Sequence, residues 1–393
     1  MVEITERELR SRVQREQHRL RHVFGDSKGW ELETFLGNGS FGITVLLRDS
    51  DPLHLRSARR DVWGQKRVVL KWALFPQLGI QDFITEIKAL KFLRGKAHHP
   101  QIIAATIDVT NYRPFSVPSV GDIFRRIIAP FINPPSNIFK ILRGNRGPAI
   151  LLEYIENGSL QKLSQRAWRL NIDFPNRLLW SFYLCLVRAC AGLHYPHVVP
   201  KPGDGPLVLE TITRPEPNGF AHNDIALRNI MVGRSDHLVA EHGIMPRLHL
   251  IDYGLSTDIP NSKQAVRDNL FGITVAILHL INPNLGPISN TNTMAYNGIM
   301  TYATDILPML GRDEFPFLDP ELRQLLVEAV AVDPNLRPSI QDMFRRTLAG
   351  KEKVADAYAD VGAGGPLAGI YDYETNEFIS RLLQQLVLDA DIV

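Results

Sequence analysis

The spacing of apolar residues predicts short strands in the first part of the chain. Apolar residues in WELETFLGNGSFGITVLLRD (30–49) and KRVVLKWALF (66–75) predict a meander of antiparallel strands with a glycine turn. The run AILLEYI (149–155) predicts a buried strand that ends at the turn residues Asn157 and Gly158. Together these runs predict a small antiparallel sheet.

Helical spacing of apolar residues dominates elsewhere. Residues 4–23 predict a charged helix whose thin apolar stripe packs on a neighbour, and residues 80–93 predict a second helix. Two short apolar strands are expected in NIMVG (229–233) and LHLIDYG (248–254). Further helices are expected in LLWSFYLCLVRACAGLHY, LFGITVAILHLI, ELRQLLVEAVAV, SIQDMFRRTL and FISRLLQQLVL. The predicted fold class is therefore α+β, with a small β-rich part followed by a larger helical part.

Composition narrows the class of protein. The chain has 393 residues, of which 45% are hydrophobic, so it can form two or three cores or one large two-lobed unit. With 44 Lys and Arg against 42 Asp and Glu, the formal charge is only +2. A generally basic nucleic-acid-binding protein is therefore not expected.

Cysteine usage and hydropathy predict a soluble intracellular protein, in the cytoplasm or the nucleus. Cys185 and Cys190, five residues apart on a predicted helix, should point in different directions as reduced core residues. The first residues include acidic side chains and no apolar segment, so a signal peptide is not expected. No run of about 18 apolar residues occurs, so we expect no transmembrane segment.

The first candidate binding feature is the glycine pattern of Gly37, Gly39 and Gly42 between two predicted strands. A dinucleotide-binding pattern of this kind must open a helix, whereas here ITVLL continues as a strand. A strand on both sides suits a flap whose backbone N–H groups close over a triphosphate. An ordinary tight hairpin is the alternative interpretation.

A lysine and a glutamate follow on neighbouring elements. Lys71 lies among apolar residues on a predicted buried strand, where an ammonium group is costly unless it meets an anion. Glu86 lies on the inward side of the next predicted helix and can point toward Lys71. The alternatives are an edge-strand lysine that reaches water and a solvated glutamate.

The strongest pattern is AHNDIALRNIMVG (221–233), followed by LHLIDYG. Asp224 and Asn229 lie in a loop that leads into a strand, and Asp252 lies at the end of the next strand. These side chains supply hard oxygen ligands for Mg²⁺ and one carboxylate that can orient a hydroxyl. A turn role explains each aspartate alone, but explains the ordered set badly.

These elements, in this order, resemble the eukaryotic-type protein kinase family from about Trp30 to Leu348. The resemblance implies a bilobal protein-kinase-like fold and the cofactors ATP and Mg²⁺. It further implies that Lys71, held by Glu86, contacts the α- and β-phosphates, that Asp224 orients the substrate hydroxyl, and that Asn229 and Asp252 bind the metal. Arg228 either reaches the γ-phosphate or is a surface arginine.

The same resemblance implies a nucleotide site between the lobes. Its lining would comprise the glycine turn with Ser40 and Phe41, Val69 over the adenine, Leu152 at the back pocket, and backbone groups of Glu153 and Ile155. The implied domains are a helical extension (1–29), a kinase-like domain (30–348, with lobes 30–152 and 153–348 and an insert at about 111–146), and a helical tail (349–393). The basic, apolar insert either packs on its own lobe or docks a partner.

Several departures from the family pattern concern the substrate. Asn223 replaces the usual arginine before the catalytic aspartate, so activation through a loop phosphate is not expected. Only about 16 residues separate Asp252 from Asp268, the aspartate expected to open the next helix, and no A-P-E motif is present. The late motif AVDPNLRPSI supplies Arg337 without its usual glutamate partner. The peptide-docking platform is therefore expected to be short.

Three hypotheses for function follow. The first is a protein kinase that transfers the γ-phosphoryl group of ATP to Ser/Thr or Tyr, with a protein substrate or signalling partner. The second is a kinase-like pseudoenzyme or scaffold that binds nucleotide without efficient turnover, which the short segment favours. The third is a small-molecule phosphotransferase, which needs no peptide platform.

Overall fold

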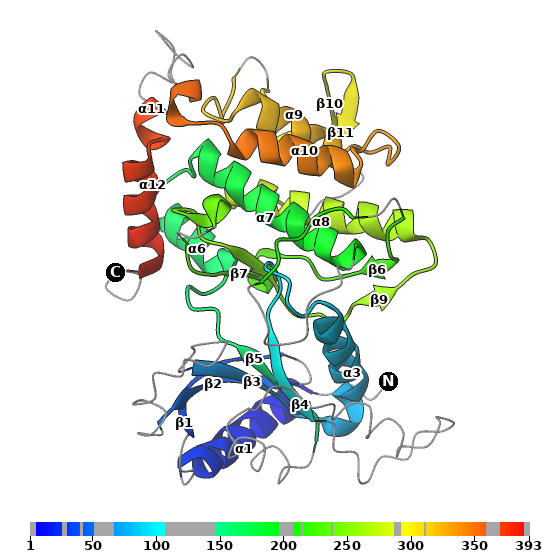
Figure 1. Cartoon of the computed structure of the whole chain (residues 1–393), viewed down its shortest axis with the longest axis vertical. Helices are drawn as coiled ribbons and strands as arrows, with labels where there is room; N and C mark the ends of the chain where they lie inside the picture. Colours follow the sequence, from blue (N-terminus) through cyan, green and yellow to red (C-terminus); the bar gives the residue numbers. More distant parts are fainter. Residues whose placement is uncertain are drawn as a thin grey trace.

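The computed structural model describes residues 5–25, 30–39, 42–50, 67–106, 147–195, 207–213, 216–236, 239–286, 292–309, 312–358 and 370–388. Figure 1 shows an antiparallel sheet in the first part of the chain and helices in the second, so the predicted α+β class is confirmed. The insert at 111–146 lies outside the described residues. None of the helices in the described ranges has the length and hydropathy to cross a bilayer.

The main sheet has five antiparallel strands in the order β1-β2-β3-β5-β4. The strands are β1 (Trp30–Asn38), β2 (Gly42–Asp49), β3 (Arg67–Ala73), β4 (Ile102–Thr106) and β5 (Ala149–Glu153). Side chains alternate along β3: Val68, Leu70 and Trp72 are buried, whereas Val69 and Lys71 are only half-buried. The half-buried side chains therefore share one face of the sheet.

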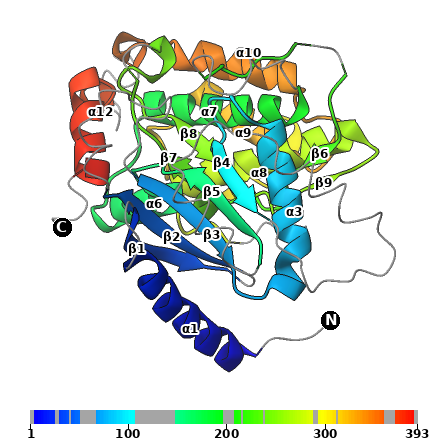
Figure 2. The same cartoon turned by 60° about the horizontal axis from the view of Figure 1, so that its bottom comes forward.

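Helix α1 (Glu6–Gly25) covers the other face (Figure 2), so the prediction that the charged helix packs on a neighbour is confirmed. Its Leu20 and Phe24 are buried in one apolar cluster with Leu70 and Trp72 of β3. The Arg12 guanidinium donates from Nε to the Leu74 carbonyl, 2.9 Å away, just after β3. Helix α3 (Pro76–Phe92) follows and lies beside the half-buried face of the sheet.

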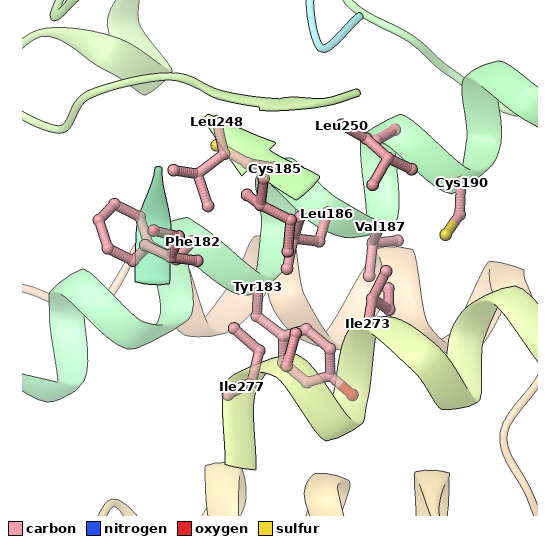
Figure 3. Packing of buried hydrophobic residues seen from close by; sticks show 14 of the residues in the cluster. Phe182, Tyr183, Cys185, Leu186, Val187, Cys190, Leu248, Leu250, Ile273 and Ile277 are labelled. Atoms are coloured by element: carbon pink, nitrogen blue, oxygen red, sulfur yellow. The ribbon is translucent and has the colours of Figure 1, made fainter. Parts of the chain in front are cut away.

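The second apolar core is built around helix α7 (Asn176–His194), in which nearly every residue is buried. A helix that is buried on all sides needs apolar residues around most of its surface, which α7 has, and its buried Arg188 is paired with Glu241. Figure 3 shows Phe182, Leu186 and Val187 of α7 between strand β8 and helix α8. Helix α7 packs against α8 (Ser262–Ile281) and α10 (Ile340–Lys351), and α6 (Leu160–Arg169) and α9 (Pro320–Ala329) contribute residues to the same core.

Short strands complete the second part of the chain. They form the pairs β6 (Phe220–Ala221) with β9 (Thr257–Asp258), β7 (Ile230–Val232) with β8 (Leu248–Leu250), and β10 (Met294–Tyr296) with β11 (Ile299–Thr301). Between them lie the single-turn helices η1 (Leu227–Asn229), η2 (Ala240–His242) and η3 (Thr304–Ile306), and η4 (Ala355–Tyr358) follows α10. Both expected strands at 229–233 and 248–254 are thus present.

The C-terminal tail docks on the helical part (Figure 1). Helix α11 (Ile370–Tyr373) precedes α12 (Asn376–Leu383), and a wider helical turn, η5 (Gln384–Leu388), continues it. The buried carboxylate of Glu374 accepts the N–H groups of Asn176 and Arg177, at 2.6 and 2.9 Å. No residue preceding α7 caps it with a side chain, so the tail supplies the cap of the central helix.

Candidate functional site

The glycine turn joins β1 to β2, as expected from the sequence. The Gly39 N–H donates to the Gly42 carbonyl at 2.9 Å, which closes the turn. A Cβ at Gly37 or Gly39 would meet no atom within 4 Å, whereas one at Gly42 would lie 3.3 Å from the Trp72 carbonyl. Gly42 is therefore needed for packing, and the backbone at the other two glycines is open to a ligand. Ser40 and Phe41 lie outside the described residues.

Lys71 brings three distant segments together. Its ammonium nitrogen lies 2.6 Å from Glu86 Oε2 on α3 and 2.9 Å from Asp252 Oδ1 after β8. The side chain of Glu86 is 4% exposed, while that of Asp252 is 44% exposed. Lys71 thus holds one buried carboxylate and one accessible carboxylate.

Burial and charge act in opposite directions on these three groups. Burial alone would lower the pKa of Lys71, but the carboxylates of Glu86 and Asp252 outweigh it and raise that pKa. Burial raises the pKa of Glu86, and Lys71 offsets this only in part. Burial would also raise the pKa of Asp252, but Lys71 outweighs it, so that pKa is lowered. Near neutral pH the ammonium group and the Asp252 carboxylate are both charged.

Sequence reasoning missed a third carboxylate, Asp82. It lies one turn before Glu86 on α3, and its Cβ would be 3.6 Å from a Cβ built at Gly254. Burial raises the pKa of Asp82, Lys71 lowers it, and the charge of Asp252 raises it further. The i, i+4 spacing from Glu86 was the available signal, because residues four apart share one helix face.

The loop before β7 arranges Asp224, Arg228 and Asn229 as one unit. Asn229 is buried and donates from Nδ2 to the Asp224 carbonyl at 2.9 Å and to Asp224 Oδ2 at 2.8 Å. The exposed guanidinium of Arg228 pairs with Asp224 Oδ1. Each oxygen of the Asp224 carboxylate therefore has a partner, and the carboxylate has a fixed orientation.

The buried ring of His222 connects this loop to Asp252. The Asp224 N–H donates to His222 Nδ1 at 3.3 Å, so Nε2 carries the hydrogen and donates to the Ile251 carbonyl at 3.1 Å. Burial lowers the pKa of His222, which keeps the ring neutral. The Ile251 N–H in turn donates to the Asn229 carbonyl at 2.9 Å. These hydrogen bonds hold the loop that contains Asp224 next to the segment that contains Asp252.

Helix α8 positions the loop through Asn269 rather than Asp268. The His222 N–H donates to Asn269 Oδ1 at 3.0 Å, and Asn269 Nδ2 donates to the Phe220 carbonyl at 2.8 Å. The expectation that Asp268 opens this helix is wrong: α8 begins at Ser262, and Asp268 is an exposed residue that accepts from Gln264. The polar cap Asn261 starts the helix earlier than its apolar residues indicate.

The segment after Asp252 is short and tightly held. Asn223, whose φ is +64°, donates from Nδ2 to the Leu255 carbonyl at 3.0 Å and to Thr257 Oγ1 at 2.9 Å. Asparagine tolerates this left-handed backbone better than most residues. The Ile259 N–H donates to the Gly219 carbonyl at 2.8 Å, and a Cβ at Gly219 would lie 1.9 Å from the Ile259 oxygen. Residues 253–261 thus lie fixed against the loop.

The remaining residues of the implied nucleotide site lie on β3 and at the end of β5. Val69 pairs with Leu152, and both are half-buried. Glu153 and Ile155 are buried. The Glu153 N–H donates to the Gln101 carbonyl at 3.0 Å, and its carboxylate accepts the Gln101 N–H at 2.7 Å. The N–H of Glu153 is therefore used within the protein, and burial raises the pKa of its carboxyl group to about 7.

Arg337 forms no ion pair with a carboxylate of the described residues. Its guanidinium carbon lies 4.6 Å from the centre of the Phe271 ring on α8, and its Nε donates to the Ala331 carbonyl at 2.8 Å. A cation over an aromatic face and a carbonyl together replace an ion pair. The residue therefore fastens the α9–α10 connection to α8.

No protein-family model matches this chain, and no curated protein matches it either. The functional argument therefore depends on the residues and contacts of this chain.

Proposed function

We propose that this protein is a phosphotransferase with a bilobal, protein-kinase-like fold, which transfers the γ-phosphoryl group of Mg-ATP to a Ser/Thr or Tyr hydroxyl of a protein. The observation that carries the proposal is the meeting of Lys71, Glu86 and Asp252. These residues come from a strand, a helix and a loop separated by up to 181 positions in the chain. A solvated lysine or an isolated turn aspartate would not require this meeting.

The phosphate end of the site uses the ammonium of Lys71 and the open backbone at Gly37 and Gly39. The buried carboxylate of Glu86 holds the ammonium in place at 2.6 Å. Asp252 lies farther from the Lys71 nitrogen than Glu86 does, and its side chain is accessible. The ammonium group can therefore exchange its contact with Asp252 for phosphate oxygens while it keeps its contact with Glu86. Positioning and neutralisation of charge are the main contributions of a protein to phosphoryl transfer.

The metal ligands fit magnesium by the chemistry of their donor atoms. Asp252 offers an accessible carboxylate, and Asn229 donates its amide hydrogens to Asp224, which leaves the amide oxygen as its ligand atom. Magnesium prefers oxygen ligands and is held by one or two carboxylates together with phosphates. Bound Mg²⁺ would supply neutralisation of the charge on the β- and γ-phosphates.

The acceptor end of the site uses Asp224. Asn229 holds its carboxylate and His222 accepts its backbone N–H, and the carboxylate can accept a hydrogen bond from a substrate hydroxyl and then take its proton on Oδ1 or Oδ2. Arg228 lies against the same carboxylate with 58% of its side chain exposed. Its guanidinium can turn from Asp224 to the transferred phosphoryl group, which is the role we assign to it.

The fixed segment at 253–261 supports activity without prior phosphorylation, because Asn223 already holds the position that a phosphate–arginine pair would organise. The same short segment favours a second candidate, in which the acceptor is the hydroxyl of a small molecule. The assembled Lys71–Glu86 pair argues against a third possibility, a scaffold without turnover.

The experiment combines melting temperature with transfer of the γ-phosphate. Mg-ATP should raise the melting temperature of the wild-type protein, because a ligand that binds only the folded state stabilises it. Asp252→Asn should lose the magnesium-dependent part of this increase, and Asp224→Asn should keep it but lose transfer. Asp268→Asn is the matched control, since Asp268 is an exposed aspartate that contacts Gln264.

The outcomes separate the candidates. Phosphate on Ser, Thr or Tyr of protein, absent with Asp224→Asn, supports a protein kinase. Phosphate found only on small alcohols supports the second candidate. A wild-type protein whose melting temperature does not respond to Mg-ATP would overturn both, as would an Asp252→Asn variant with full transfer activity.

A further inference from the structure

A buried group of three potential metal ligands lies outside the site described above. His98, in the connection between α3 and β4, Cys185 on α7 and His242 in η2 each offer one ligand atom, and these atoms lie within 4.8 Å of one another. The residues are 0%, 2% and 1% exposed, respectively. They come from three segments that are far apart in the sequence, so the group is a product of the fold.

The two histidine rings carry polar atoms without partners in the interior. Among the residues that the structure describes, His98 Nε2 and both ring nitrogens of His242 have no hydrogen-bond partner. A buried polar atom without a partner destabilises the folded state, so such atoms are rare in folded proteins. The ring centroids lie 5.3 Å apart at an angle of 58°, which excludes a simple stack. A bound ion would give a partner to His98 Nε2 and to one of the two ring nitrogens of His242.

The surroundings of His98 are those of a metal ligand. Its Nδ1 lies 2.5 Å from Glu210 Oε2, and its backbone N–H donates to Glu210 Oε1 at 2.8 Å. The Nδ1–H donates to the carboxylate, so Nε2 keeps its lone pair and the ring has a fixed orientation. Histidines that bind metals usually donate their other N–H to a carboxylate or carbonyl in this way.

Helix α7 connects the segments that carry the three residues, through hydrogen bonds of Arg188. Cys185 and Arg188 lie one turn apart on this helix. Arg188 donates to both oxygens of Glu241, the neighbour of His242, and to the carbonyl of Glu210. Arg247, the other guanidinium that acts on both histidines, pairs with Asp236. Arg188 and Arg247 are thus each paired with a carboxylate, while a third cation, Lys351, also acts on His242.

The thiol of Cys185 is suited to the third ligand position. Figure 3 shows its side chain beside Leu248 of β8, whereas Cys190 lies further along the helix and points elsewhere. The Leu248 backbone forms a hydrogen bond with the sulfur of Cys185. A backbone N–H that already points at sulfur can stabilise a thiolate when a metal displaces the proton.

We propose that His98, Cys185 and His242 bind one Zn²⁺ ion that links the α3–β4 connection, helix α7 and the β7–β8 connection. Two imidazole nitrogens and one thiolate are ligands that zinc prefers, and water fills the fourth position. Zinc bonds of about 2.0 to 2.3 Å in a tetrahedron place the ligand atoms about 3.4 to 3.8 Å apart. The ligand atoms lie within 4.8 Å of one another here, so binding would draw them closer together. The proposal is independent of the phosphotransferase activity.

The test measures metal content of the full chain, purified without a histidine tag and passed through a desalting column. We expect about one zinc ion per wild-type chain, measured by inductively coupled plasma mass spectrometry. Cys185→Ala and His242→Ala should each lose most of the zinc. Cys190→Ala should keep it, because Cys190 is an equally buried thiol on the same helix that is not in the group.

A second measurement needs no variant and guards against loss of folding. Wild-type protein treated with a chelator and then with Co²⁺ should show the visible absorption of tetrahedral cobalt and a thiolate-to-metal charge-transfer band. Wild-type protein that lacks zinc and shows neither band would overturn the proposal. Retention of zinc in both the Cys185→Ala and His242→Ala variants, or copper in place of zinc, would overturn it equally.

Discussion

Glu153 makes the stability of the protein depend on pH in a direction opposite to that of most carboxylates. The residue is 8% exposed, and its carboxylate accepts the N–H of Gln101 at the end of β5. Burial raises its pKa from 4.5 to about 7. A carboxyl group whose pKa is raised in the folded state binds its proton more tightly there. Its contribution to stability is therefore present below about pH 4.5 and is lost as the pH rises through about 7.

The substitution Glu153→Gln removes this effect and keeps the acceptor oxygen for Gln101. The interval between 4.5 and about 7 corresponds to about 3 kcal/mol, which is the largest gain that the variant can show. We expect Glu153→Gln to be more stable than the wild type by up to this amount at about pH 8. At about pH 4 the two proteins should have nearly the same free energy of unfolding.

Urea denaturation followed by tryptophan fluorescence measures the two free energies across this range of pH. Glu31→Gln, which changes an exposed carboxylate of the same sheet, controls for general effects of the substitution. The reasoning is refuted if the difference between Glu153→Gln and wild type does not change with pH. It is also refuted if the variant is less stable at about pH 8.

Three further predictions concern the contacts that hold the loop and the tail. Asn223→Ala should lower the free energy of unfolding by about 2 kcal/mol, because two hydrogen bonds are lost and alanine is strained at this φ. Asn223→Gly should lower it less, because glycine adopts this φ without strain. Amide hydrogen exchange at residues 255–258 should be faster in both variants. Gly219→Ala should lower the free energy of unfolding, measured by urea denaturation, by about 1 to 3 kcal/mol, because the new methyl group would overlap the Ile259 oxygen. Gly37→Ala should change it little, because no described atom lies within 4 Å of the new methyl group. Glu374→Ala should lower stability by about 2 kcal/mol by removing the cap of α7, and an unchanged melting temperature would contradict this.

Much of the fold was predictable, because apolar periodicity is a local signal. The strands at 30–49 and 67–73 and the helix that contains Leu186 follow directly from it, and the structure has them. Helix boundaries were less predictable. The start of α8 is set by Asn261, a polar cap that lies outside the apolar run LFGITVAILHLI.

The candidate site was predictable where residue type and order carry the information. Lys71, Glu86 and Asp252 were singled out from the sequence, and the structure brings them into contact. Asn269 was not, because its role arises only from tertiary neighbours, and Asp82 was not, although it lies four residues before Glu86 on the same helix face. The same holds for the group around His242, whose members are distant in the sequence and have no regular spacing.

Through the hydrogen bond from Arg12 to the carbonyl of Leu74, helix α1 contacts a residue that lies beyond the sheet that it covers. Leu74 lies in the connection that leads from β3 into α3, and α3 carries Glu86. Helix α1 is therefore linked through one hydrogen bond to the connection that leads into the helix of Glu86, the partner of Lys71. A chain shortened to begin at Trp30 would lose this hydrogen bond just before α3, so the position of Glu86 measured in it would not describe the 393-residue chain.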